Sequence, residues 1–373
     1  MKIFFICKRR YMSQDVILDR YGRLYHLPYE LSLLGHDVYG NCLSYQKTSP
    51  YHESPKQTTS NTNRLTWTSE YAGILGYKIP YYVQRLLKAI QMIQPDVILG
   101  SSDVLHAIIT HIVGVKTNIP YFLDLYDNYE SFGMCKIPGM RYAYRKALRN
   151  AESIFTVSNT LREHIQSILP GASVVTIEST ISEGSFGPYD KTEARKILKL
   201  PQNKILIGTA GALSRNRGTE HLYEAFFKVK EIFPATCLIL AGPVGDNPPP
   251  DNPDIIYLGQ LPHPSIPLLF NALDVAVICM KDDNFGRYAF PQKAFEILAC
   301  KVPVVCSAVG ALKNLLADYQ DCLYIPDDPL DLAYKIRKQI HSKIIPDTSI
   351  PTWKDQAQKL QEALLSKTNK LTG

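Results

Sequence analysis

Short runs of apolar residues alternate with longer amphipathic stretches along the first half of the chain. Runs such as KIFFIC, PDVILGSS and SIFTVS predict buried strands, and stretches such as YHLPYELSLLGH and TLREHIQSIL predict helices between them. Strands that are apolar throughout are typical of a parallel sheet covered by helices on both faces. Residues 45–70, which are rich in Ser, Thr, Pro and Asn, are predicted to form a long loop.

A second series of the same kind follows an interruption at 180–190, STISEGSFGPYD. Asp190 is expected to cap the first helix of this series, with Glu193 three residues later. The pattern predicts an α/β protein with two Rossmann-like domains, 1–185 and 186–350, and a ligand-binding cleft between them. A further helical pattern, 351–373, follows Pro351 and lies outside the repeat.

Composition fits a folded protein of this size. The chain has 373 residues, of which 45% are hydrophobic and 20% charged, enough for two domains. No apolar run approaches a membrane span, and the opening MKIFFICKRR is better interpreted as a strand than as a signal peptide, so we expect the protein in the cytoplasm. Eight cysteines without a CxxC spacing predict reduced packing residues, with a metal or redox site as the alternative.

Several clusters of basic residues lie in the first half of the chain. In MRYAYRKALRNA, residues 140–151, Arg141, Arg145 and Arg149 recur every fourth residue and predict one basic helix face. Such a face suits anionic lipid at the inner face of the cytoplasmic membrane, or a pyrophosphate-linked acceptor, and a solvated helix face is the alternative. No recognition helix or stacking motif accompanies the charge, so nucleic acid is not an expected partner.

A basic loop between two glycines, in TAGALSRNRGTEHL, is the first candidate site. A strand is expected to end at Gly211 and a helix to begin at Gly218, so that Arg215 and Arg217 lie beside a helix N-terminus. Backbone N–H groups, the helix dipole and two guanidiniums together suit a diphosphate. Because glycine followed by basic residues also occurs by chance, an ordinary loop remains the alternative.

A single acidic residue in FGRYAFPQKAFEILACKVPVV is the second candidate. Glu296 is expected a turn and a half inside a helix that starts at Pro291, near the carboxyl edge of a parallel sheet. A carboxylate there can accept hydrogen bonds from two adjacent ribose hydroxyls. The alternative is a glutamate that faces solvent.

The order of motifs over about 205–308 resembles the donor half of the retaining GT-B glycosyltransferases called glycosyl transferases group 1, which are family 4-like. Between the two candidates lie AGP at 241–243 and YLGQLPHPSIPLLFNALD, and ExxACxxPVV follows. The resemblance implies that Arg217 binds the donor diphosphate, Glu296 the ribose and the Leu261 region the base. YGRLYHLPYELSLLGHDV resembles the family's glycine loop more weakly, which places Gly22 near the sugar and diphosphate. The last helix, with Trp353, resembles the crossover back to the N-terminal domain.

Two departures from the family pattern concern the donor side. Gly211-Ala212 stands where members commonly have Gly-Arg, so we expect Arg215 to supply the missing cation. Tyr288 stands where the first of two glutamates is usual, and that glutamate usually touches the donor sugar. Pro291, Lys293 and Glu296 form the familiar PxKxxE variant. Lys293 is expected either to reach a donor phosphate or sugar, or to lie on the helix surface.

The acceptor side is expected in the first domain. FLDLYDNYESFG resembles the segment where the family places a His-Asp pair, and this chain has Tyr126-Asp127. Asp127 is the candidate catalytic group, which would orient or deprotonate the acceptor hydroxyl. The alternative is that Asp124 or Asp127 caps the following loop. His106, within a helical pattern, is expected to be structural.

The resemblance implies hexosyl transfer from a nucleoside diphosphate sugar, such as a UDP or GDP sugar, to an acceptor hydroxyl with retention. The expected acceptor is a glycan or lipid-linked glycan of bacterial polysaccharide or glycolipid biosynthesis. Arginines and a helix terminus would stabilise the leaving diphosphate, so no metal or other cofactor is expected. A sugar-nucleotide 2-epimerase of the same fold and an inactive scaffold that binds nucleotide sugars remain alternatives.

Overall fold

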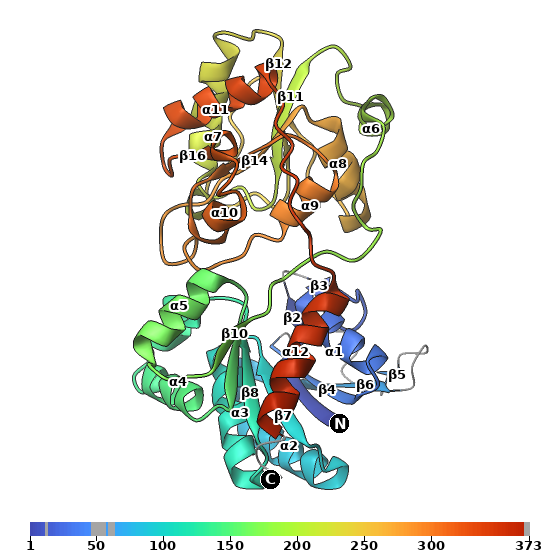
Figure 1. Cartoon of the computed structure of the whole chain (residues 1–373), viewed down its shortest axis with the longest axis vertical. Coiled ribbons are helices and arrows are strands. Elements are labelled where there is room, and N and C mark those ends of the chain that lie inside the picture. Colours follow the sequence, from blue (N-terminus) through green and yellow to red (C-terminus); the bar gives the residue numbers. More distant parts are fainter. Residues whose placement is uncertain (12–13, 46–56, 59–63, 369–373) are drawn as a thin grey trace. The chain divides into compact units, whose positions relative to one another are not determined.

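The computed structural model describes residues 1–11, 14–45, 57–58 and 64–368 (Figure 1). The chain forms two compact units. Unit 1 consists of Met1–Ser179 together with Trp353–Gly373, and unit 2 consists of Thr180–Thr352. The divisions lie within a few residues of the expected ones after 185 and 350.

Unit 1 is built on an eight-stranded sheet with the order β10-β9-β8-β7-β1-β4-β6-β5. Every named pairing in it is parallel except that of β5 with β6. A two-stranded antiparallel ribbon, β2 with β3, follows β1. The strands are β1 Lys2–Lys8, β2 Arg10–Tyr11, β3 Gln14–Asp15, β4 Asp37–Ser44, β5 Gln57–Thr58, β6 Leu65–Tyr71, β7 Val97–Ser101, β8 Tyr121–Leu125, β9 Ser153–Thr156 and β10 Val174–Thr176.

Helices cover both faces of this sheet. Helices α1 and α12, at opposite ends of the sequence, lie side by side (blue and red in Figure 1) on the face lined by Ile3 and Phe5. On the other face the α2 residue Tyr82 donates a hydrogen bond of 2.7 Å to Asn41 of β4. The helices are α1 Arg23–Leu33, α2 Ile79–Ile93, α3 Val104–Thr117, α4 Met140–Arg149, α5 Asn159–Ile168 and α12 Trp353–Thr368, with 3-10 turns at Ile74–Gly76, Tyr129–Ser131 and Gly133–Lys136.

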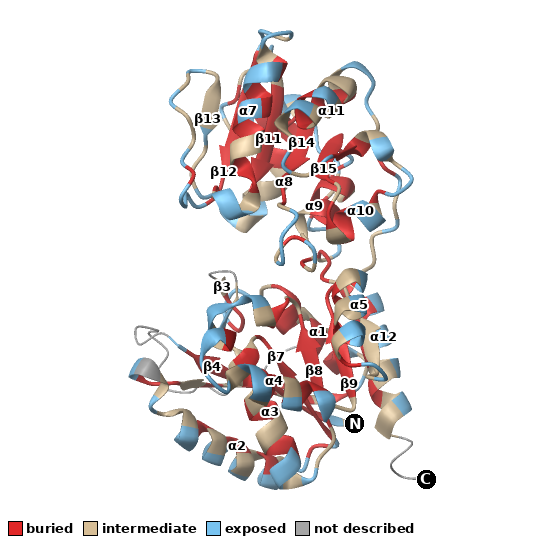
Figure 2. Cartoon of the chain, turned by 90° about the vertical axis from the view of Figure 1, so that its left-hand side faces the viewer, coloured by how far each residue is buried: buried red, intermediate tan, exposed pale blue. Residues whose placement is uncertain are grey.

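Unit 2 repeats the arrangement on a six-stranded parallel sheet with the order β13-β12-β11-β14-β15-β16. Helices α7 and α11 cover one face, and α6, α8, α9 and α10 pack on the other. The strands are therefore buried (red in Figure 2), except for the edge strand β13, which is partly exposed. The elements are α6 Lys191–Ile197, β11 Ile205–Ala210, η4 Arg215–Arg217, α7 Thr219–Lys230, β12 Thr236–Ala241, β13 Ile255–Tyr257, η5 His263–Ser265, α8 Ile266–Ala272, β14 Val275–Ile278, α9 Lys293–Ala299, β15 Val304–Ser307, α10 Gly310–Leu315, η6 Gln320–Cys322, β16 Leu323–Tyr324 and α11 Pro329–His341.

Several sequence predictions are confirmed, and one is wrong. The two large sheets are parallel apart from the β5–β6 pair, the Asp190 side chain accepts from Glu193 N at 2.8 Å as a cap, and all eight cysteines are free and buried. The prediction of a loop over 45–70 is wrong at the C-terminal end of this range, because Leu65–Tyr71 forms strand β6. Its alternate residues Leu65, Trp67 and Ser69 are buried, a strand period that is disguised by Thr and Glu at the intervening positions and by Ser at a buried one. The rest of that loop prediction, at 46–56 and 59–63, lies outside the described residues. None of the described helices combines the length and apolar character that a membrane crossing requires.

Candidate functional site

The carboxyl end of strand β11 forms the base of the candidate site in unit 2. Gly211 follows the strand with φ of +133°, and its N–H donates to the Ala241 carbonyl at 2.9 Å. A β-carbon on Gly211 would lie 3.3 Å from Nζ of Lys293, and one on Gly242 would lie 2.1 Å from the Gly211 carbonyl oxygen. Glycine is therefore required at both turns, because the two backbones and a lysine side chain meet there.

The basic loop brings one of its two arginines into this site. Residues Arg215–Arg217 form η4, and Gly218, at φ of +71°, precedes α7 without a side-chain cap. The Arg217 guanidinium lies 4.1 Å from the centroid of the Phe285 ring and is half-buried. Arg215 is exposed, and its backbone N–H donates to Asp246 at 2.9 Å. Only Arg217 is therefore packed against the neighbouring loop.

Helix α9 supplies a lysine and a glutamate three residues apart. Lys293 donates from Nζ to the Ala210 carbonyl at 3.1 Å, so it points toward the end of β11. Glu296 is 8% exposed, and its carboxyl group makes no hydrogen bond within the described part of the chain. Buried polar groups normally have such a partner. The position of this carboxyl group is therefore unusual for a structural residue.

Burial and charge perturb both groups on α9. Burial raises the pKa of the Glu296 carboxyl to about 7, and the nearby Lys293 ammonium opposes this rise. The pKa of Lys293 is lowered, first by burial and then by the positive charge of Arg217, while Glu296 acts in the opposite direction. Two cations and one carboxyl group therefore act on one another at the end of β11, an arrangement that favours an anionic ligand with hydroxyl groups.

The helix boundary at this site differs from the prediction. Helix α9 begins at Lys293, so Glu296 lies in its first turn, and Pro291 precedes the N-cap residue Gln292. The Pro291 carbonyl accepts from Ala294 N at 2.9 Å, which lets the chain enter the helix two residues later than expected. A proline before the cap shows where a helix may start but does not fix its first residue.

Leu261 lies apart from the charged groups, in the turn after β13. It is half-buried and packs against the same core cluster as Ala294 and Phe295 of α9. Sequence reasoning missed Phe285, since nothing in the loop KDDNFGRYAF indicates that this ring packs on Arg217. Among the described residues, no three His, Cys, Asp or Glu side chains are grouped so that they could hold a metal ion.

The remaining two candidates, Gly22 and Asp127, belong to unit 1. Gly22 precedes α1 with φ of +69°, and a β-carbon there would lie 2.6 Å from the ring of Tyr11. Asp127 is half-buried, and its Oδ1 accepts from Asn128 N at 2.9 Å. This contact agrees with the loop-capping alternative without excluding a role toward a ligand.

Asp124, the other acidic residue of that segment, forms a buried ion pair that the sequence did not indicate. Its carboxylate accepts from Arg23 Nη2 at 2.6 Å and Nε at 3.1 Å, and from Ser101 Oγ at 2.7 Å. Arg23 also donates to the Ile177 carbonyl at 2.9 Å and to Ser179 Oγ at 3.2 Å. The pair therefore connects the first turn of α1 to the carboxyl edge of the sheet.

The basic face predicted on 140–151 is less charged than its sequence implies. The predicted helix is present as α4. Arg145 donates to both carboxylate oxygens of Glu130 at 2.8 and 2.9 Å, and Arg141 lies 4.0 Å from the same carboxylate. One acidic residue from the preceding turn thus offsets part of the charge of two arginines.

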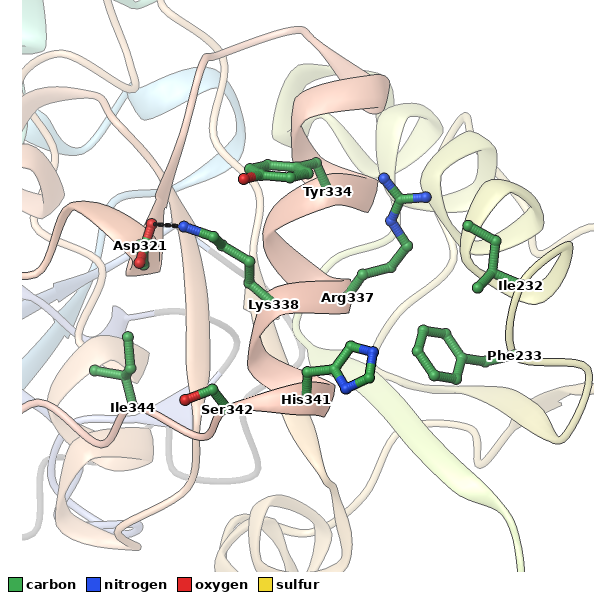
Figure 3. A pocket seen from close by; sticks show the side chains of 9 residues that line it. All are labelled: Ile232, Phe233, Asp321, Tyr334, Arg337, Lys338, His341, Ser342 and Ile344. Carbon is green, nitrogen blue, oxygen red and sulfur yellow. Dashed lines mark hydrogen bonds and ion pairs between the residues drawn. The ribbon is translucent and has the colours of Figure 1, made fainter.

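A pocket of about 400 Å³ lies elsewhere in unit 2, beside the last turns of α11 (Figure 3). It is formed mainly by α11 residues with Ile232 and Phe233, which follow α7, and Lys338 there donates to Asp321 at 2.8 Å. Because α7 runs from Gly218 toward Phe233, this pocket lies at the other end of that helix from the candidate site. Basic residues at helix C-termini offset the helix dipole, which is sufficient explanation for Lys338 and His341.

Comparison with known proteins finds a family match that lies within unit 2. Residues 204–342 match the family model "Glycosyl transferases group 1". The "Putative teichuronic acid biosynthesis glycosyltransferase TuaC" of Bacillus subtilis (strain 168) is 27% identical over 237 residues, which cover 62% of this chain and 58% of that protein. The "Lipopolysaccharide core biosynthesis mannosyltransferase LpsB" of Rhizobium meliloti (strain 1021) is 28% identical over 142 residues, 35% of this chain and 38% of that one. The chain spans about half the length of the curated relatives that it matches.

Solved structures match along the whole chain. Sucrose-phosphate synthase from Thermosynechococcus elongatus superposes with a TM-score of 0.72 at 18% identity, with all of both chains covered. Anabaena Alr3699/HepE in complex with UDP-glucose superposes with a TM-score of 0.68 at 17% identity, covering all of this chain and 99% of that one. The chain therefore has the GT-B fold, and its residues 204–342 are similar to the family of glycosyl transferases group 1.

Proposed function

We propose that the chain is a glycosyltransferase that moves a hexose from a nucleoside diphosphate sugar to an acceptor hydroxyl. Unit 2 would hold the donor and unit 1 the acceptor. The observation that carries this proposal is the group formed by Arg217, Lys293 and Glu296 at the end of β11, because it pairs two mutually repelling cations with a buried carboxyl group.

A nucleoside diphosphate matches each of these groups. The diphosphate would lie against Arg217, Lys293 and the uncapped start of α7 at Gly218, where its charge would relieve the repulsion between the two cations. Glu296 would accept hydrogen bonds from the ribose hydroxyls. Gly211 would let the diphosphate approach the backbone, and Leu261 would contact the base.

Cationic side chains would then stabilise the leaving diphosphate as the glycosidic bond breaks. We therefore expect the reaction to proceed without a metal ion, and the resemblance to retaining glycosyltransferases implies retention at the anomeric carbon. Activity that EDTA abolishes and a divalent cation restores would contradict the first expectation. In unit 1, Asp127 would orient the acceptor hydroxyl, and Gly22 would lie against the donor sugar.

The choice of nucleotide and pathway rests on relatives. Anabaena HepE is known in complex with UDP and with UDP-glucose, so UDP is the first nucleotide to test. The names of the two curated relatives concern teichuronic acid and lipopolysaccharide core biosynthesis. We accordingly place the acceptor among bacterial envelope polysaccharides or glycolipids.

Thermal unfolding with UDP, GDP, ADP and TDP sugars tests the donor site directly. A ligand at about 100 times its Kd should stabilise the protein by about 2.7 kcal/mol. Arg217→Ala and Glu296→Ala should each abolish the shift. Matched controls in unit 2 are Arg337→Ala, a half-buried arginine of α11, and Glu224→Ala, an exposed glutamate of α7, and both should leave it unchanged.

Measuring the products formed from a nucleotide sugar distinguishes a glycosyltransferase from an epimerase and from an inactive scaffold, all of which would have such a site. Release of nucleoside diphosphate that depends on an added glycan acceptor supports transfer. Interconversion of the nucleotide sugar without an acceptor would identify an epimerase. Donor binding without any product would identify a scaffold, whereas no binding of any nucleotide sugar would contradict the assignment of the site itself.

A further inference from the structure

Lys8 is a half-buried cation at the carboxyl edge of the unit 1 sheet, where it ends strand β1. Its Nζ lies 5.3 Å from the centroid of the Tyr126 ring and 5.9 Å from that of Tyr11. Within the described residues the ammonium makes no hydrogen bond and no ion pair. The two rings attract the ammonium and offset part of the cost of withdrawing it from water, but neither ring accepts a normal hydrogen bond from its N–H groups.

The acidic groups around Lys8 do not pair with it. Asp103 and Asp127 act on its charge from a distance, and burial lowers the pKa of the ammonium more than they raise it. Both oxygens of Asp103 are already engaged, since Oδ1 accepts from His106 N at 3.0 Å and contacts His106 Nδ1 at 2.8 Å, and Oδ2 accepts from the Tyr45 hydroxyl at 3.0 Å. Asp127 accepts from Asn128 N. Lys8 is thus held near two carboxylates without contacting either.

Other features of the same edge favour a ligand. The Tyr126 hydroxyl is buried near Ser102, and within the described part of the chain it makes no hydrogen bond of normal geometry. Ser102 has a strained φ of +118°, and its Oγ accepts from the backbone N–H of Lys8 at 2.9 Å. The start of α1 at Gly22, which has no capping side chain, packs on the same Tyr11 ring. Strained backbone and unsatisfied polar groups cluster where ligands bind, and open α/β sheets bind them at this edge.

We propose that Lys8 recognises an anionic group, a phosphate or a carboxylate, on the glycosyl acceptor. The inference rests on the proposed function, because it takes unit 1 to be the acceptor-binding half. An ammonium is a compact charge with three donors and suits either anion. The acceptor class is therefore a phosphorylated sugar or a uronic acid rather than a neutral hexose.

Competitive acetylation of lysines tests this assignment in the full-length protein. The protein is treated with sulfo-N-hydroxysuccinimide acetate, and the rate at each lysine is followed by mass spectrometry. The probes are inorganic phosphate and D-glucuronate, each added with saturating UDP. The blank is KCl with UDP at matched ionic strength, and KCl without UDP is the reference for the effect of UDP itself. Lys2, at the exposed start of the same strand, is the internal control.

We expect either anion, at about ten times its Kd, to slow acetylation of Lys8 roughly tenfold while Lys2 is unaffected. Protection by phosphate alone points to a phosphorylated acceptor, and protection by glucuronate alone points to a uronic acid. Equal protection of both lysines, or of neither, would overturn the proposal. Protection of Lys8 by UDP without added anion would also overturn it, because Lys8 would then belong to the donor.

The same measurement keeps this proposal separate from the proposed function. UDP should slow the acetylation of Lys293. If it does not, the proposed donor site is contradicted, whatever the result at Lys8. As a second test, Lys8→Met should leave UDP binding intact and remove binding of the protecting anion, while Lys8→Arg should keep part of it. Loss of UDP binding together with anion binding in Lys8→Met would indicate a general structural defect instead.

Discussion

The ammonium of Lys293 lies 3.3 Å from the place that a β-carbon on Gly211 would occupy. The lysine also donates to the carbonyl of Ala210, the residue before this glycine, at 3.1 Å. The absence of a side chain at the end of β11 is therefore what admits a cation from α9, a helix that begins more than eighty residues later in the sequence.

Gly211→Ala should displace Lys293 and weaken nucleotide binding. The new methyl group meets Nζ, and φ of +133° strains any residue other than glycine, which costs about 1–3 kcal/mol. Chemical denaturation measures that loss, and calorimetric titration with UDP measures binding. Gly171→Ala in unit 1 is the control, because Gly171 has φ of +88° and open space around its β-carbon position. Equal UDP affinity in the two variants would show that the position of Lys293 does not matter for the ligand.

The Glu296 carboxyl group should make both stability and nucleotide binding depend on pH. Burial raises its pKa to about 7 in the folded protein, above the ordinary value of 4.5. Between these values the unfolded chain loses the proton while the folded protein keeps it, so stability falls as pH rises from about 4.5 to 7 and levels off above 7. The full contribution is about 3 kcal/mol.

Glu296→Gln should remove this pH dependence and stabilise the protein above pH 7. Binding should respond in the opposite direction, because ribose hydroxyls donate to the ionised carboxylate, so UDP affinity of the unmodified protein should increase through pH 7. Urea unfolding and UDP titration at pH 5, 6, 7 and 8 test both. An identical pH profile in Glu296→Gln would mean that another group titrates.

Local features of this fold were predictable from the sequence. The cap formed by Asp190 and Glu193 depends on residues three apart, and the structure places it as predicted. Strand β6 was missed because Thr, Ser and Glu, which also occur in loops, make up most of it, although Trp67 is fully buried. The composition of the whole segment therefore indicated a loop, whereas the alternation of buried and partly exposed residues within it is that of a strand.

Contacts between distant segments were not predictable. Arg217 and Glu296 were named from motifs, but the packing of Arg217 on Phe285 depends on how a later loop folds. Lys293 was left between two alternatives. Its contact with the Ala210 carbonyl contradicts a position on the helix surface, and its role toward a donor stays a prediction. Arg23 and Asp124 are 101 residues apart in the sequence, and no spacing rule connects two such residues.

The buried pair of Arg23 and Asp124 should be important for the stability of unit 1. Asp124→Asn leaves the guanidinium buried without its counter-charge, and the expected loss is about 3–5 kcal/mol. Replacing both residues, as Arg23→Met with Asp124→Leu, should recover much of it, because neither charge then remains. The exposed pair of Arg64 and Asp37, at 3.2 Å, is the control, and Arg64→Met should cost at most about 1 kcal/mol. A double variant as unstable as Asp124→Asn would show that packing, and not charge, dominates there.

The surface of α4 is where we expect contact with an anionic membrane, and Glu130 should weaken that contact. Its carboxylate binds Arg145 and lies near Arg141, while Tyr142 between them is 71% exposed. A basic residue near an anionic bilayer contributes about 1 kcal/mol. Glu130→Gln should therefore raise affinity for vesicles of anionic lipid, by roughly fivefold if one arginine is released.

Sedimentation with vesicles of phosphatidylglycerol and phosphatidylcholine measures this change. Glu163→Gln, which removes an exposed carboxylate from the neighbouring helix α5, controls for net charge alone. Because both variants gain the same charge, a larger effect of Glu130→Gln assigns the contact to α4, and Tyr142→Ser should then reduce binding. If the two glutamine variants bind equally, or if neither sediments with vesicles, the arginine face is a solvated helix surface, which was the other interpretation of its sequence.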